Sequence, residues 1–276
     1  MSYRGRLAPT PTGGLHLGHA RTFHAAWQRA RSALGHLTLR IEDLDHLRCR
    51  PEYTEQLLGD FAWLGLDWDE GPLYQSRRRD VFVDAWTRLR DVGVIYPSAV
   101  SRKDVRDAAH APHEEEEGAE PIFPPALRTA PGEERRYASP AGVTWRFRVP
   151  DGRAITFEDV RCGRRTYTAG VDFGDFVVWR KDDVPAYELA VVADDAAMGI
   201  TEVVRGEDLL KSTARQLLVY EALGATPPSW CHEPLVRDAD GRRLAKRHAP
   251  LSLQHFRDLG VTVADAWALS GIPTDD

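Results

Sequence analysis

The spacing of apolar and polar residues predicts alternating strands and helices in the first third of the chain. Residues 6–20 fit a short strand, a loop rich in proline and glycine, and the first turn of a helix. A helix is then expected at 21–34, a strand at 37–41, and amphipathic helices at 51–64 and 77–92. Strand, helix and strand in close succession form a βαβ unit, which predicts an α/β fold with a parallel sheet.

The pattern changes in the middle of the chain. Residues 97–140 are rich in proline, alanine and charge and include four consecutive glutamates at 114–117, so a mobile surface loop is expected there. Residues 142–179 alternate as strands do, most clearly at 144–149 and 176–179. This stretch predicts a small inserted domain. Helical and strand signals return at 186–192, 201–206, 212–223, 251–259 and 263–269.

Composition narrows the class of protein. The formal net charge of −6 gives no overall attraction to nucleic acid, so any RNA contact must depend on local basic patches. The three cysteines are far apart and form neither a disulfide framework nor a CxxC metal site, which suits a reducing cytoplasm. No apolar run is long enough for a signal peptide or a membrane span, so the protein is expected to be cytoplasmic and without membrane contact.

The first candidate site lies in the loop and helix start at 6–20. Gly13 and Gly14 lack Cβ atoms, which allows a ligand to approach the backbone closely. His16 and His19 are three residues apart and would share one face at a helix N-terminus, where free N–H groups and the macrodipole attract phosphate. A polyphosphate site is one interpretation of this stretch. A helix start with two exposed histidines is the simpler one.

A second stretch more than two hundred residues later favours the polyphosphate interpretation. Residues 241–248 place four cations and a histidine after a turn, and a lysine there would neutralise charge on a departing pyrophosphate. The sequence His16-Leu17-Gly18-His19 resembles the HIGH signature of class I aminoacyl-tRNA synthetases, and residues 243–247 resemble their KMSKS loop. Arg243 and Ala245 depart from that second motif, whereas its central lysine is present as Lys246.

Further segments make the resemblance specific to glutamyl-tRNA synthetases. These segments are 6–13, 15–18, 40–45, 186–190 and 204–209, in the family's order and across most of the chain. The resemblance implies a Rossmann-like parallel sheet with a small inserted α+β domain of the acceptor-binding type. It divides the chain into a catalytic domain at 1–94 and 181–232, an insert at 95–180, and a KMSKS-like loop with a short helical segment at 233–276.

The resemblance also implies roles for individual residues. Glutamate would be bound by Arg6, Ala8, Pro9, Thr10, Glu42, Tyr187 and Arg205. ATP would be bound by His16, Gly18, His19, Glu207 and Lys246, of which His16, His19 and Lys246 are catalytic. Glu42 would hold the substrate α-ammonium group, although a helix cap before a solvated turn also explains an acidic residue at this strand end. Either Arg6 or Arg205 could select glutamate over glutamine, because a guanidinium fork binds a carboxylate bidentately.

The short segment after the KMSKS-like loop distinguishes among relatives. Twenty-nine residues follow Arg247, whereas glutamyl-tRNA synthetases continue with helical domains that bind the anticodon. The chain therefore resembles the truncated paralogues, the glutamyl-queuosine tRNA(Asp) synthetases. That family activates L-glutamate with ATP without tRNA and esterifies it to the queuosine of tRNA(Asp) at the wobble position. ATP, Mg²⁺, glutamate and queuosine-containing tRNA(Asp) are the expected cofactor and partners, and a monomer is expected.

Members of that family often bind zinc in the insert, but this sequence lacks the paired cysteines. Ser98 and Val100 stand in their place, and neutral hydroxyl and methyl groups cannot replace thiolates. We therefore predict no zinc.

The expected mechanism is in-line attack of the glutamate carboxylate on the α-phosphate of ATP. His16 and His19 would steady the phosphates and Lys246 would stabilise the departing pyrophosphate, so that positioning and charge stabilisation carry the step. Three alternatives remain: a minimal glutamyl-tRNA synthetase that charges a tRNA 3′ end, an enzyme that loads a protein or small molecule, and a non-enzymatic tRNA-binding or regulatory paralogue.

Overall fold

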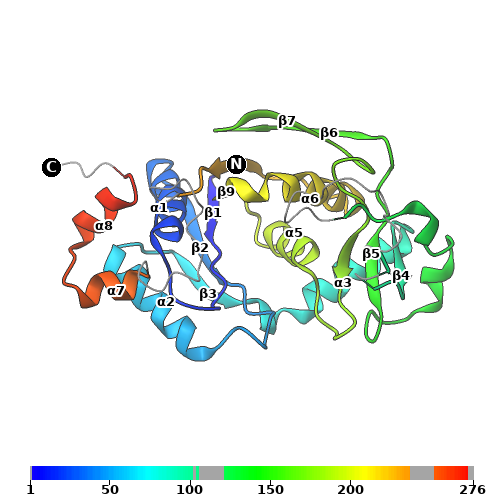
Figure 1. The fold of residues 1–276 in the computed structure, drawn as a ribbon, viewed down its shortest axis with the longest axis horizontal. Helices are drawn as coiled ribbons and strands as arrows, with labels where there is room; N and C mark the ends of the chain where they lie inside the picture. The colour runs from blue at the N-terminus through cyan, green and yellow to red at the C-terminus, as the bar shows by residue number, and fades with distance from the viewer. Residues whose placement is uncertain (1, 102–103, 106–120, 237–251, 273–276) are drawn as a thin grey trace.

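The computed structural model describes residues 2–101, 104–105, 121–236 and 252–272, and a parallel sheet lies at its centre (Figure 1). Strands β1 (Arg4–Leu7), β2 (His36–Ile41) and β3 (Glu70–Tyr74) pair in parallel, as do β9 (Glu202–Gly206) and β10 (Ser229–Glu233). The two groups meet where the Thr201 N–H donates to the Arg4 carbonyl at 2.8 Å. The five strands therefore lie in the order β3-β2-β1-β9-β10, which confirms the predicted α/β fold with a Rossmann-like sheet.

Helices lie between the strands in the chain and pack around the sheet (Figure 1): α1 (Leu17–Ser32), α2 (Pro51–Leu64), α3 (Arg79–Asp91), α5 (Tyr187–Ala197) and α6 (Leu210–Ala222). Helices α7 (Leu253–Asp258) and α8 (Val263–Leu269) follow β10 and lie beside α1 and α2. The predicted bounds of α2 are confirmed, because Pro51 begins the helix and Gly65 ends it in the left-handed conformation, with φ 71°. The helical turn predicted at the end of residues 6–20 is also found, because α1 begins at Leu17, and the helix ends at Ser32, two residues before the predicted end. None of the described helices is long and apolar enough to cross a membrane.

The segment predicted as an insert contributes two β-structures. Strands β4 (Ile95–Ser98), β5 (Thr144–Phe147) and β8 (Phe176–Trp179) form an antiparallel sheet. Strands β6 (Ala154–Asp159) and β7 (Gly163–Thr168) form a hairpin, and β6 pairs with β10 beside Trp230. The hairpin therefore extends the central sheet. The glutamates at 114–117 lie outside the described residues.

A continuous hydrophobic core joins the inserted strands to the helices of the central sheet. Trp145 and Trp179 of the insert are fully buried, and they belong to one cluster with Trp86 of α3, Leu189 of α5 and Trp230 of β10. The rings of Trp86 and Trp145 meet edge to face with centroids 4.9 Å apart. This packing fixes the inserted strands relative to the sheet, and the predicted domain boundaries stay a prediction.

A buried carboxylate connects α2 to α7. The side chain of Asp60 is fully buried, and its Oδ1 atom accepts a hydrogen bond at 3.0 Å from Nη1 of Arg257, which is partly exposed. Burial raises the pKa of Asp60 to about 6, and Arg257 and the Leu15 N–H oppose that rise only in part. The folded state therefore binds a proton at Asp60 more tightly than the unfolded chain does.

This carboxylate predicts a pH dependence of stability. Because the raised pKa belongs to the folded state, the contribution of Asp60 is gained as the pH falls through 6 and is lost above it. From about pH 7.5 to about pH 5, we expect the free energy of unfolding to rise by about 1 kcal/mol relative to an Asp60→Asn variant. Urea unfolding of both proteins at the two pH values measures this difference. Identical pH profiles would contradict it.

Candidate active site

The two histidines of the first motif lie at the start of α1. His16 is the N-cap residue, with an extended backbone, so it precedes the helix and does not lie on its face as expected. His19 is in the first turn, and the Nδ1 atom of each ring accepts a hydrogen bond from the backbone N–H of the other residue at 3.4 Å. The rings stack with centroids 3.7 Å apart. Both therefore lie at a helix N-terminus, where the macrodipole favours an anion.

Gly18 leaves room for the His16 ring. A Cβ atom at this residue would lie 3.0 Å from Cε1 and 3.1 Å from Nδ1 of that ring, which is closer than side chains normally pack. A larger residue at position 18 would therefore have to shift the imidazole that caps the helix by a few tenths of an ångström.

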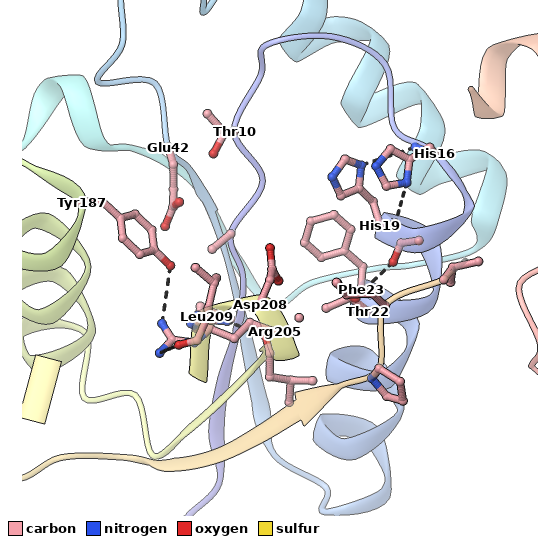
Figure 2. Close-up of a pocket in the computed structure, with 18 residues that line it drawn as sticks. Thr10, His16, His19, Thr22, Phe23, Glu42, Tyr187, Arg205, Asp208 and Leu209 are labelled. Carbon is pink, nitrogen blue, oxygen red and sulfur yellow. Dashed lines mark hydrogen bonds between the residues drawn. The ribbon is translucent and has the colours of Figure 1, made fainter. Parts of the chain in front are cut away.

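A cavity of about 340 Å³ opens between this helix start, the ends of β1, β2 and β9, and the start of α5 (Figure 2). It brings together residues that are far apart in the sequence. Those predicted from the sequence are Arg6, Ala8, Thr10, His16, Gly18, His19, Glu42, Tyr187 and Arg205. Those that sequence reasoning missed are Thr22, Phe23, Val204, Gly206, Asp208, Leu209, Pro234, Leu235 and Val236.

Two of the predicted residues, Pro9 and Glu207, do not line this cavity. The carbonyl of Pro9 accepts a hydrogen bond from the Glu42 N–H at 2.9 Å, so Pro9 positions the end of β2. The Glu207 carboxylate accepts from the Leu235 N–H at 3.1 Å and so supports the part of the cavity wall that follows β10. Lys246 lies outside the described residues.

Glu42 is held by a buried network of charges. Oε1 of Glu42 accepts a hydrogen bond at 2.9 Å from Arg40, which is fully buried and also binds Asp195 at 2.5 Å. Arg6 lies 3.6 Å from the same Asp195 carboxylate and donates to the Val204 carbonyl at 3.0 Å. Burial raises the pKa of Glu42 above its usual value, and Arg40 opposes this. A cationic ligand group beside Glu42 would favour its ionised form.

Arg205 has a different environment from Arg6 and Arg40. Its guanidinium is buried and donates to Thr213 Oγ1 at 2.6 Å, Gln216 Oε1 at 2.9 Å and His232 Nε2 at 3.1 Å. All these acceptors are neutral, and within the described parts of the chain no carboxylate lies within ion-pair distance of Arg205. A buried cation with only neutral partners attracts a ligand carboxylate.

Sequence reasoning had one usable signal for the residues behind Arg205. Thr213 and Gln216 are polar residues three positions apart on a predicted helix, and both are buried on the face that contacts Arg205. Asp195 and His232 gave no such signal, because each lies on a different element from the arginine that it contacts, Arg40 and Arg205 respectively.

No metal centre is visible in the described residues: nowhere in them do three His, Cys, Asp or Glu side chains lie close enough together to hold an ion. At the position of the expected cysteine pair, the Ser98 hydroxyl is buried and accepts a hydrogen bond from the Val100 N–H at 3.4 Å. The absence of zinc stays a prediction.

The fold and the site define a class. The sequence model of the family described as "tRNA synthetases class I (E and Q), catalytic domain" matches residues 2–265, and the chain belongs to this family. A glutamate tRNA ligase from Elizabethkingia meningosepticum, solved in complex with its amino acid, superposes with a TM-score of 0.75 and 29% identity over 90% of this chain and 52% of that one.

Within the class, the chain is similar over nearly its whole length to proteins named glutamyl-Q tRNA(Asp) synthetase. It is 46% identical to the one from Nitratidesulfovibrio vulgaris, over 95% of this chain and 83% of that protein, and 47% identical to the one from Symbiobacterium thermophilum, over 94% and 82%. The glutamate–tRNA ligase of Thermosynechococcus vestitus is 42% identical, but the match covers 55% of its length. The resemblance drawn from the motifs is confirmed.

Proposed function

We propose that this protein is a ligase that activates L-glutamate with ATP without tRNA and then transfers glutamate to the queuosine of tRNA(Asp). The observation that carries the proposal is the composition of the cavity. On one side of it lie the Glu42 carboxylate and the buried Arg205 guanidinium, which has no carboxylate partner among the described residues, and the histidine pair at the helix N-terminus lies on the other side (Figure 2). The two relatives that match over more than four fifths of their length support the acceptor.

The amino-acid end of the cavity fits glutamate. Glu42 would bind the α-ammonium group, and Arg205 would bind the side-chain carboxylate with Tyr187, whose hydroxyl lies 3.4 Å from the Arg205 guanidinium. Arg205 is favoured over Arg6 for this role, because Arg6 already faces the Asp195 carboxylate. Ala8 and Thr10 would complete the wall beside the substrate.

The other end fits the phosphates of ATP. His16 and His19 would contact them at the start of α1, and Gly18 would leave room for the His16 ring. Glu207 would support the nucleotide indirectly, through the Leu235 backbone. Mg²⁺ bound to the phosphates would neutralise part of their charge.

The proposed reaction has two steps. A carboxylate oxygen of the substrate α-carboxylate attacks the α-phosphorus of ATP, and the bond to pyrophosphate breaks, which gives glutamyl-adenylate. Lys246 stabilises the charge on the leaving pyrophosphate. A hydroxyl of the queuosine cyclopentenediol then attacks the glutamyl carbonyl, loses its proton and releases AMP. These substrates place the proposed reaction in the cytoplasm, and a monomer suffices for it.

ATP–pyrophosphate exchange tests the activation step. We expect exchange that requires glutamate, proceeds without tRNA and is far weaker with glutamine. Exchange that appears only after tRNA is added would contradict tRNA-independent activation. No exchange under any condition would instead favour a non-enzymatic RNA-binding paralogue.

A further inference from the structure

The Arg205 guanidinium is backed by two residues that take no part in the proposed reaction. His232 of β10 is fully buried, and its Nε2 atom lies 3.1 Å from Nε of Arg205. On the other side of the ring, Nδ1 lies 2.6 Å from Oδ2 of Asp159, whose carboxylate is also fully buried. The three side chains form a hydrogen-bonded chain from the end of β6 to the cavity.

The chemistry of the partners fixes the protonation of the imidazole. The Asp159 carboxylate can only accept a hydrogen bond, so Nδ1 of His232 carries the proton. The Arg205 N–H can only donate, so Nε2 carries none. Burial, with Arg205 next, lowers the pKa of His232 to about 4, so the ring is neutral at neutral pH.

Asp159 is itself fixed by the turn of the β6–β7 hairpin. Its Oδ1 atom accepts hydrogen bonds from the backbone N–H groups of Arg161 at 3.0 Å and Cys162 at 2.7 Å. The His232 N–H also donates to this carboxylate, at 3.2 Å to Oδ2. Although burial raises the pKa of Asp159, these hydrogen bonds hold it below its usual value, so the carboxylate stays ionised. The His232 ring lies between this negative charge and the Arg205 guanidinium.

We propose that His232 and Asp159 are positioning residues that make the pocket select a carboxylate side chain over a carboxamide. The neutral ring gives Arg205 an acceptor that fixes its orientation. As a spacer, it also keeps the Asp159 carboxylate from pairing with Arg205 directly. A direct ion pair, such as Arg40 makes with Asp195, would neutralise the cation before substrate arrives. The inference rests on the proposed function, in which Arg205 binds the glutamate side chain.

Three variants test this arrangement in the full-length protein. His232→Leu removes the acceptor from Arg205. Asp159→Asn places an amide N–H, a donor, against Nδ1 of His232 in place of the carboxylate oxygen, an acceptor. This change favours the His232 tautomer that carries its proton on Nε2, facing Arg205. His232→Gln keeps a side-chain carbonyl that can accept from Arg205 and is the conservative control.

Pyrophosphate exchange with glutamate or glutamine, and with ATP varied separately, measures the effect. For His232→Leu and Asp159→Asn we expect KM for glutamate to rise about tenfold or more and the preference for glutamate over glutamine to fall by a similar factor. KM for ATP should change by less than about threefold, because the histidine pair that contacts the phosphates is untouched. His232→Gln should restore much of the preference.

The outcomes separate this inference from the proposed function. If KM for glutamate and KM for ATP rise equally, or if the glutamate preference is unchanged in a folded variant, the positioning role is wrong. Thermal unfolding identifies variants that fold. If His232→Leu does not fold, Asp159→Asn is compared with His232→Gln instead. An equal preference for glutamate over glutamine in these two variants would overturn the inference. Failure of the wild-type protein to catalyse exchange would refute the proposed function instead.

Discussion

Replacing Arg205 with leucine is expected to lower kcat/KM for glutamate in pyrophosphate exchange by about a thousandfold. The guanidinium is buried and has only neutral partners, so the substrate carboxylate would be its first ion-pair partner in the described part of the chain. Without it, a charged carboxylate would have to leave water for a site whose other described cation, Arg6, already faces the Asp195 carboxylate. Most of the loss should appear in KM, because the side-chain contact is the same in substrate and transition state.

Two further substitutions make this test specific. Arg205→Lys keeps the charge but loses the guanidinium fork, so an intermediate loss is expected. Arg153→Leu is the matched control, because Arg153 pairs with Glu221 on the surface, and exchange should stay near the wild-type rate. An Arg205→Leu enzyme within tenfold of the wild type would show that another group binds the side chain.

Replacing Lys246 with alanine is expected to slow formation of glutamyl-adenylate by about a hundredfold or more. The reason is that pyrophosphate gains negative charge as it leaves, and the lysine of the KMSKS-like loop would stabilise that charge only in the transition state. Single-turnover formation of the adenylate measures the rate, and equilibrium binding measures the affinity for glutamate, which should change by less than about threefold.

The control for Lys246→Ala is Lys181→Ala, which removes a lysine from an exposed turn after β8. That variant should form adenylate at the wild-type rate. If Lys246→Ala weakened glutamate binding as much as it slowed the chemical step, a transition-state role for this lysine would be wrong.

Much of the fold could be predicted because its main elements carry their own local signals. The bounds of α2 follow from Pro51 and Gly65, and β2 alternates leucine and isoleucine with polar residues after a helix end. Strands β3, β4 and β10 were missed because they are short and contain residues unusual in strands, such as Gly71 and Pro72 in β3. They are strands because the neighbouring strands pair with them.

The site was predictable to the extent that its residues lie in sequence motifs. Arg6, Glu42 and Arg205 lie at or just beyond strand ends, and parallel strands bring such ends to one edge of the sheet. The partners that decide their roles could not be predicted. Asp195 lies 155 residues from Arg40 in the sequence. Its carboxylate faces Arg6 and balances the positive charge of that residue, whereas it does not balance the charge of Arg205.

The acceptor is tested most directly by transfer of labelled glutamate, with ATP and Mg²⁺, to tRNA from cells that make queuosine and from cells that cannot. The account predicts label only on queuosine-containing tRNA(Asp). It also predicts that periodate oxidation of the queuosine diol before the reaction prevents labelling. Label on tRNA(Glu) from both kinds of cell would contradict the account and would identify a minimal glutamyl-tRNA synthetase.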